Sequence, residues 1–251
     1  MKVSTIFPKA VKSIVVILFW LSVWYIAAAA VNMEIFLPFP HVVLTKLISL
    51  MGTAAFWEAV GVSLWRIARG FIYGVVLGFV TALLTHYVPV TKAFIAPLLR
   101  TVRATPVVSF ILLAFLWLNN DAIPVFIALL MVIPIIWENL SAGLGALDTE
   151  LSEMARVYRI PKGRTLTRII APQLHPYFYS GAVTSLGLAW KSGIAAEVIS
   201  YPTVAIGKAM NNAKTTLDTA EVLAWTVVVV VLSLVFEAVI KRLLRKRGKR
   251  K

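Results

Sequence analysis

Apolar segments alternate with short polar or basic stretches along most of the chain. An α-helix needs about 20 mostly apolar residues to cross a bilayer. Six segments approach this requirement, each bounded by charged residues, prolines or polar clusters, and they cover residues 14–31, 61–87, 102–118, 122–140, 177–200 and 222–240. Several of them are short in clean apolar length, so tilting or burial within a bundle is expected. The pattern predicts an all-α integral membrane protein with about six transmembrane helices.

The first apolar segment has two interpretations. It follows basic residues and ends in four alanines, as a secretory signal peptide does. Its apolar run is long, however, and its aromatic residues suit a membrane interface, which favours a retained helix: Trp20, Trp24 and Tyr25. The topology predicted for the later segments is the same in both cases.

The composition agrees with a lipid environment. Hydrophobic residues fill 60% of the 251 positions and charged residues 14%, whereas a soluble domain has about 45–50% apolar and about 25% charged residues. No long polar stretch is left for a second domain, so residues 1–251 are expected to form one membrane domain. Because the sequence has no cysteine, disulfides, thiolate catalysis and cysteine-based zinc sites are excluded.

The placement of the charges predicts the orientation of the chain. The formal net charge is +14, and most of the 25 Lys and Arg residues flank the apolar segments. Basic residues of short loops collect on the cytoplasmic side. With both termini in the cytoplasm, that side holds four groups: Lys2, Lys9 and Lys12; Lys92, Arg100 and Arg103; Arg156, Arg159, Lys162, Arg164 and Arg168; and the tail 241–251. Arg66 and Arg69 do not fit this arrangement, so we expect them to snorkel or to pair with Glu58.

The basic tail, residues 241–251, could anchor the last helix and contact anionic lipid headgroups. The alternative is a nucleic-acid-binding arm, which would need aromatic stacking residues or a recognition fold nearby. Neither is found in the adjoining sequence. The tail is therefore interpreted as a membrane anchor, with lipid and not nucleic acid as its partner.

Small residues recur every four positions in the second and the fifth apolar segment. This spacing lets helix backbones approach closely in lipid, where apolar burial alone gives little driving force. The two sets are Gly70, Gly74, Gly78 and Ala82, and Gly181, Ser185, Ala189 and Gly193. We expect both faces to pack against other helices.

A polar stretch, residues 148–172, separates the fourth from the fifth segment. Asp148 can cap a short helix that runs to about Tyr158. Ile160 precedes Pro161 and therefore avoids the helical region, so the helix is expected to break there. A second short helix is expected to end near Pro172. Two short amphipathic helices in a basic loop would present a compact knob to a groove on another protein.

This stretch resembles the signature loop of permeases of binding-protein-dependent ABC importers. The family pattern is Glu-Ala-Ala, three residues, Gly, nine residues, then Ile, any residue and Leu-Pro. Here it falls on Glu153-Met154-Ala155, Arg159, Ile169, Ala171 and Pro172. The spacing matches, but Met154, Arg159 and Ala171 depart from the pattern. Arg159 replaces a glycine that would permit a left-handed turn, and Gly163 is expected to make the turn instead.

The resemblance extends from about residue 38 to residue 240, where several short motifs are similar to the nitrate, sulfonate and taurine branch of the family. These are Ser63-Leu-Trp-Arg66 with Gly70, Pro97-Leu-Leu-Arg100 with Pro106 and Trp117, and Trp190 with Glu197. The branch implies a small organic or inorganic anion as substrate. The alternative within the same family is a vitamin or vitamin precursor.

The resemblance also implies the partners. The loop 148–172 would act as a cytoplasmic coupling helix that contacts a separate ATPase, through Glu153, Met154, Ala155, Arg156, Arg159, Gly163, Ile169 and Pro172. Two permease copies, most simply a homodimer, would enclose the pore in the bacterial inner membrane. An extracytoplasmic solute-binding protein would deliver the substrate. The chain lacks a phosphate-binding Gly-x-x-x-x-Gly-Lys-Ser/Thr motif, so no cofactor is expected on it and ATP would bind to the partner.

The fifth segment contains the candidates for the translocation path. Ser180, Thr184, Gly187 and Lys191 share one helical face. Lys191 has two interpretations, since a charge inside a membrane costs about 2.5–3.5 kcal/mol: it lines the path and attracts an anion, or it pairs with Glu197 or Glu138. Family resemblance adds Trp190 and Glu197 as path or gate residues.

Two other classes of protein remain as alternatives. An intramembrane enzyme would need a nucleophile with a base, or paired carboxylates, within the bundle. The acidic residues are instead spread singly, so no catalytic residue is assigned. A stand-alone secondary transporter tends to show an internal repeat, and the two halves show none that is convincing.

Overall fold

The computed structural model describes residues 9–248, and side-chain surroundings are described from residue 14 onward except at 152, 240 and 243–248. Lys2 and the last three residues of the basic tail lie outside this range. All regular elements within it are helices: α1 Lys9–Val31, α2 Pro40–Met51, α3 Ala54–Tyr87, α4 Pro89–Ala104, α5 Val107–Ala114, α6 Ile123–Gly145, α7 Thr149–Val157, α8 Lys162–Thr165, the π-helix η1 Leu166–Ile170, α9 Ala171–Ser200, α10 Ile206–Thr215 and α11 Thr219–Gly248. The all-α prediction is confirmed for the described residues.

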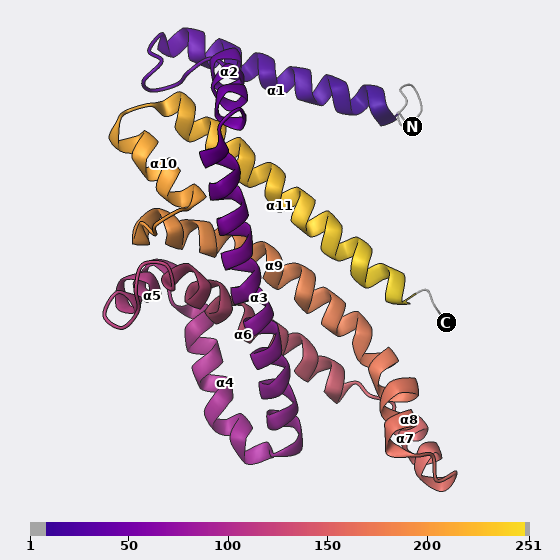
Figure 1. Cartoon of the computed structure of the whole chain (residues 1–251). Helices are drawn as coiled ribbons and strands as arrows, with labels where there is room; N and C mark the ends of the chain where they lie inside the picture. Colours follow the sequence, from indigo (N-terminus) through magenta and orange to yellow (C-terminus); the bar gives the residue numbers. More distant parts are fainter. Residues whose placement is uncertain (1–8, 249–251) are drawn as a thin grey trace.

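Helix α6 is the centre of the bundle, because it packs most extensively against α3 on one side and α9 on the other (Figure 1). The predicted small-residue face of α3 makes the first contact. A Cβ added to Gly70 would lie 2.5 Å from the Val125 carbonyl oxygen, and one added to Gly78 would lie 2.8 Å from the Ile136 Cβ. Only glycine allows backbones to approach this closely. The predicted packing role of these glycines is confirmed.

The small-residue face of α9 makes the second contact. Gly181, Ser185, Ala189 and Gly193 are all buried. A Cβ on Gly181 would lie 3.0 Å from the Cβ of Asn139 in α6, and one on Gly193 would lie 2.7 Å from Ile67 in α3. Helix α9 therefore closes a three-helix core with α3 and α6.

The segment predicted over residues 102–118 is not one continuous helix. Helix α4 ends at Ala104 and α5 begins at Val107, and the two are bent by 101°. The break falls at Thr105-Pro106, where Thr105 has extended backbone angles. Proline lacks a backbone N–H and disfavours the helical region for the residue before it, so the helix cannot continue. The apolar pattern alone does not reveal this bend.

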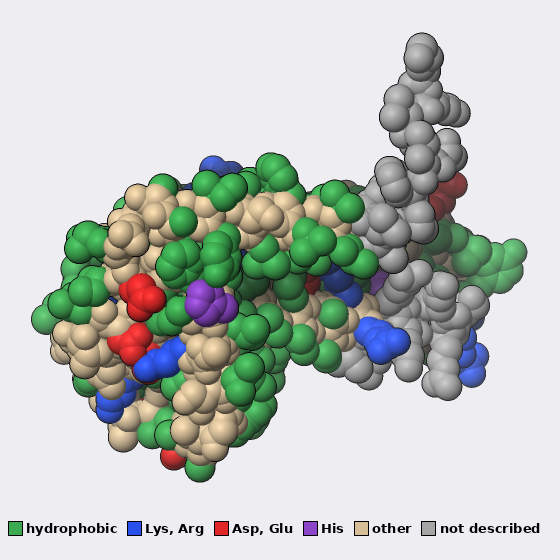
Figure 2. Space-filling view, turned by 90° about the horizontal axis from the view of Figure 1, so that it is seen from above, with side chains coloured by type: hydrophobic (Ala, Val, Ile, Leu, Met, Phe, Trp, Pro, Cys, Tyr) green, Lys and Arg blue, Asp and Glu red, His purple; other side chains and the backbone are tan. Residues whose placement is uncertain are grey.

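Among the described residues, four helices are long and apolar enough to cross a membrane, and the bent pair α4–α5 could make a fifth. Helix α9 has 30 residues but carries polar side chains along its length and is not one of the four. Helices α2 and α10 are among the elements that lie outside the six predicted segments. Figure 2 shows hydrophobic side chains over much of the surface seen from above, as lipid contact requires.

Helix α1 stands apart from the core. It contacts mainly α2, and its apolar side chains are exposed on nearly all sides, among them Trp20 and Ile26 (Figure 1). Its sequence is the one that also resembles a signal peptide. The rest of the fold does not depend on α1 for packing.

The close approach of α3 to α6 gives a direct test. In Gly74→Ala, the added Cβ would lie 2.6 Å from the Val132 Cβ and 2.9 Å from the Leu129 carbonyl oxygen. We expect a loss of about 1–3 kcal/mol of stability, measured as a lower apparent Tm of the purified chain in detergent. The matched control is Gly61→Ala on the same helix, where nothing lies within 4 Å of the added Cβ. If both variants melt at the same temperature, the proposed packing constraint does not exist.

Candidate functional site

The stretch 148–172 forms a hairpin that extends beyond the bundle at the end where α6 stops and α9 starts (Figure 1). The Asp148 side chain accepts hydrogen bonds from the backbone N–H groups of Glu150 and Leu151, at 2.9 and 3.3 Å, and so caps α7. The helix ends at Val157, as predicted from the proline that follows. We call residues 148–165 the hairpin.

The turn of the hairpin is made by Arg159. Its φ is 50°, the left-handed conformation that the family's glycine would adopt. The N–H of Ile160 donates to the Ala155 carbonyl at 2.8 Å, and the N–H of Arg159 donates to that of Arg156 at 3.1 Å. This pair of bonds is the Schellman arrangement that ends many helices. The prediction that Gly163 makes the turn is wrong, because Gly163 lies within α8 and has no positive φ.

The second helix of the hairpin does not end near Pro172, contrary to the prediction. Helix α8 continues through the π-helix η1 into α9, and Pro172 occupies the first turn of α9. A proline there is tolerated, because the first N–H groups of a helix have no partner within it. The hairpin is therefore joined to α9 without an intervening loop.

Apolar side chains on the hairpin are exposed although the segment is otherwise polar. Val157 is 74% and Tyr158 76% exposed, while Ala155 is buried. Of the other predicted coupling residues, Ile169 is half-buried and the rest are exposed: Glu153, Met154, Arg156, Arg159, Gly163 and Pro172. Exposed apolar groups within a charged segment are typical of a protein interaction surface.

Helix α9 has the two faces that its sequence predicts. Ser180, Thr184 and Lys191 are exposed and Gly187 is half-buried, opposite the buried small residues. The other described residues of the chain leave this face uncovered. Lys191 does not pair with either predicted carboxylate, because Glu138 pairs with Arg103 and Glu197 with Arg66. That alternative for Lys191 is therefore wrong in this structure.

An ionic cluster, with Arg66 and Glu197 buried and Asp121 partly exposed, lies at the opposite end of the bundle from the hairpin. Arg66 of α3 donates to Glu197 of α9 at 2.9 Å, to Asp121 before α6 at 2.7 Å, and to the Val204 carbonyl at 3.1 Å. Its predicted pairing with Glu58 is wrong. We call Ser63, Arg66, Asp121 and Glu197 the Arg66 cluster. A buried charge needs such partners, since its desolvation costs several kcal/mol.

The carboxylates of the cluster are fully hydrogen-bonded. Glu197 also accepts from the Ser63 hydroxyl at 2.8 Å and from the Gly207 N–H at 3.2 Å. A Cβ on Gly207 would lie 2.5 Å from that of Glu197, so only glycine fits there. Asp121 accepts from the Thr203 hydroxyl and N–H. Partial burial opposes ionisation of Asp121, but these bonds and the neighbouring guanidinium outweigh it and lower the pKa of its carboxyl.

Trp190 and Glu197 occupy the interior of this chain. Glu197 is 0% and Trp190 1% exposed. The Trp190 Nε1 donates to the Val229 carbonyl at 3.0 Å, and its ring stacks on Phe236 of α11. These two residues therefore hold α9 to its neighbours, whereas Ser180, Thr184 and Lys191 face outward. Sequence reasoning missed the cluster because its members are far apart along the chain.

The comparison with known families agrees with the hairpin and the bundle. Residues 74–249 match the family described as "Binding-protein-dependent transport system inner membrane component". The chain belongs to this family. It is accordingly a multi-pass membrane protein of a transport family, and the expected relationship to ABC importer permeases is confirmed.

Individual relatives lie in the expected branch of the family. The chain is 24% identical to the taurine transport system permease protein of Escherichia coli, over 89% of this chain and 83% of that protein. It is 26% identical to a Bacillus subtilis transport permease named for aliphatic sulfonates, over 84% and 76%. The bicarbonate transport system permease protein of Synechococcus elongatus is 26% identical over 61% of this chain, which spans about half (55%) of that relative.

The fold also resembles a solved structure, titled as the crystal structure of an amino acid ABC transporter with histidines. The TM-score is 0.62, with 16% identity, and the match covers 83% of this chain and 97% of the other. At this identity the likeness concerns the fold alone. The two chains therefore share the same arrangement of helices over most of this chain.

The left-handed Arg159 offers a prediction about the hairpin. Because a non-glycine residue in this conformation costs about 1–2 kcal/mol, Arg159→Gly should stabilise the turn by up to about 1 kcal/mol. Hydrogen exchange of the Ile160 amide, which donates to Ala155, should become slower. Gly163→Ala is the control, since no atom lies within 4 Å of its added Cβ, and it should leave that exchange rate unchanged. Faster exchange in Arg159→Gly would contradict the assigned turn.

Proposed function

We propose that the chain is the membrane-spanning subunit of an ATP-driven importer of a small anion. A second copy would complete the pore, separate ATPase subunits would grip the two hairpins, and an extracytoplasmic solute-binding protein would deliver the substrate. The observation that carries this proposal is the hairpin. The hairpin exposes apolar side chains on a chain that belongs to the permease family. It continues without a loop into α9, whose polar face is exposed.

The hairpin suits a contact with a soluble motor. Val157 and Tyr158 project from a segment that also carries seven charged residues among its 18. Lipid would not tolerate those charges, and water would not favour the exposed apolar groups, so a protein groove satisfies both. ATP would bind to that partner, as the missing phosphate-binding motif requires.

The proposed orientation places the hairpin in the cytoplasm together with both termini. The hairpin and η1 carry five basic residues, which the positive-inside rule assigns to that side: Arg156, Arg159, Lys162, Arg164 and Arg168. The Arg66 cluster then lies toward the outer side, where the solute-binding protein would dock. This arrangement corresponds to the bacterial inner membrane.

The exposed face of α9 is the proposed wall of the pore. Ser180 and Thr184 offer hydroxyl groups, and Lys191 adds a positive charge that has no ion pair within the described residues. The named relatives carry bicarbonate, sulfonates or taurine, and each of these bears an anionic group. An unpaired ammonium group on such a wall favours anions over cations.

Lys191 provides the test of this proposal. The chain would be reconstituted in vesicles with the ATPase and solute-binding protein of its transport system, and ATP-dependent uptake of labelled taurine, methanesulfonate and bicarbonate would be measured. Lys191→Met should reduce uptake of the transported anion at least about tenfold, because the attraction at the pore wall is lost. Lys191→Arg keeps the charge and should retain uptake. ATP hydrolysis stimulated by the binding protein should persist in both variants.

Two results would contradict the proposal. Uptake that continues without ATP or without the ATPase subunit would point to a stand-alone transporter. Equal uptake by Lys191→Met and the unmodified chain would remove Lys191 from the path.

A further inference from the structure

A charged cavity of about 320 Å³ lies between α4 and α6. Lys92, Arg100 and Arg103 of α4 line it, and their spacing of eight and three residues places them on one helical face. The opposite face of α4 is apolar, with Phe94 75% exposed. The cations are thus turned away from the side that suits lipid and toward α6.

The cavity has a surplus of positive charge. Arg103 pairs with Glu138 of α6, whereas Lys92 and Arg100 have no ion pair within the described residues. Glu138 lies inside the apolar span of α6, seven residues before its end at Gly145, or about 10 Å along the helix. Charges at such depth normally face a partner or a water-filled cavity.

One wall of the cavity has an unused hydrogen-bonding group. The Ser141 hydroxyl is buried and has no hydrogen-bond partner, although it lies among the lining residues. Glu138 precedes Ser141 by about one turn of α6 and also lines the cavity. If this side chain turns toward the cavity, a bound oxyanion can accept a hydrogen bond from its hydroxyl while the charge of the anion meets the two unpaired cations.

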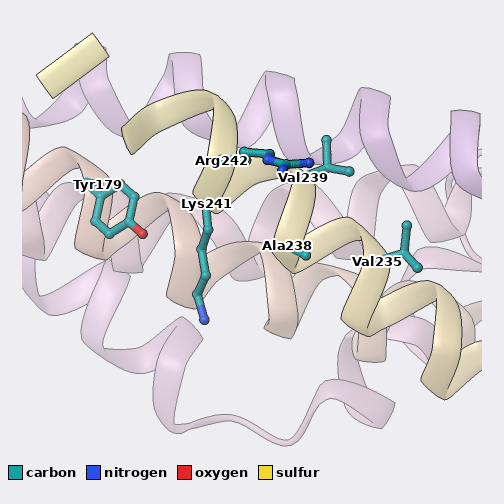
Figure 3. A pocket seen from close by; sticks show the side chains of 6 residues that line it. All are labelled: Tyr179, Val235, Ala238, Val239, Lys241 and Arg242. Atoms are coloured by element: carbon teal, nitrogen blue, oxygen red, sulfur yellow. The ribbon is translucent and has the colours of Figure 1, made fainter. Parts of the chain in front are cut away.

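A second basic groove differs from the α4–α6 cavity in the residues that line it. It lies between α9 and α11, has a volume of about 460 Å³, and is lined by Tyr179, Lys241 and Arg242 beside an apolar wall that includes Val235 and Val239 (Figure 3). Its two cations sit at the end of this apolar wall, as suits a lipid chain with its headgroup. The α4–α6 cavity instead has four charged lining residues.

We propose that the α4–α6 cavity binds a small oxyanion, of the sulfonate, carboxylate or bicarbonate class, through Lys92, Arg100 and the Ser141 hydroxyl. A guanidinium group donates two parallel hydrogen bonds to such an anion, and the ammonium group adds charge. This role rests on the proposed function: the cavity would be a transient binding site for the transported anion between the pore and the cytoplasm. The binding itself does not depend on the direction of transport.

The test uses the full-length chain in phosphatidylcholine nanodiscs with trifluoromethanesulfonate as the probe. Fluorine NMR should show saturable line broadening that methanesulfonate reverses by competition, at constant ionic strength. Arg100→Gln and Lys92→Gln should each weaken binding about tenfold. Arg242→Gln, in the groove between α9 and α11, is the matched control and should leave the affinity unchanged.

Three outcomes would overturn the proposal. These are the absence of saturable broadening with the unmodified chain, an equal effect of Arg100→Gln and Arg242→Gln, and loss of binding when phosphatidylglycerol replaces phosphatidylcholine. The last result would assign the cavity to a lipid headgroup. The two cations are tested singly, so one variant that fails to fold leaves the other informative.

The uptake assay separates this inference from the proposed function. Probe binding without transport of any anion would refute the proposed substrate class and leave the cavity in place. Two results would refute the anion site in the cavity and leave the proposed function in place. One is anion transport by a chain that does not bind the probe, and the other is undiminished transport by Arg100→Gln.

Discussion

The close contact of α3 with α6 is the constraint on which the rest of the structure depends. Three glycines on α3 let the two backbones approach to distances at which any added Cβ would clash. Helix α6 is thereby held in the centre, where its other side receives the small-residue face of α9. Because apolar burial gives little driving force in lipid, this dense packing is the main source of specificity for the bundle.

Helix α9 connects the two regions that are relevant to transport. It is joined to the hairpin through η1 and ends at the Arg66 cluster, and its 30 residues span about 45 Å. Glu197 in its last turns is bonded to α3 and to the start of α10. Under the proposed function, a displacement of the hairpin would move α9 as one continuous helix. The far end of α9 is held by the ion pair between Arg66 and Glu197. The exposed polar face of α9 lies between these two ends.

Local signals in the sequence were sufficient for part of this account. Asp148 as a cap, the break before Pro161 and the two small-residue faces are all short-range patterns, and the structure confirms them. The ion pair of Arg66 with Glu197 joins residues 131 positions apart, so no local pattern could assign it. The bend at Thr105-Pro106 was missed because the apolar stretch that follows Pro106 was extended back across the proline to Val102. The left-handed Arg159 was missed because the turn follows the family spacing and not the residue type.

The central claim is that a separate ATPase grips the hairpin. Its most direct test is photocrosslinking from position 158, where the Tyr158 side chain is 76% exposed, in the assembled complex in native membranes. The same crosslinker at Leu217, which is 67% exposed and lies near the opposite end of the bundle, is the control. The account predicts an adduct with the ATPase subunit from position 158 and none from position 217. An adduct with the ATPase from position 217, or none from position 158, would contradict it.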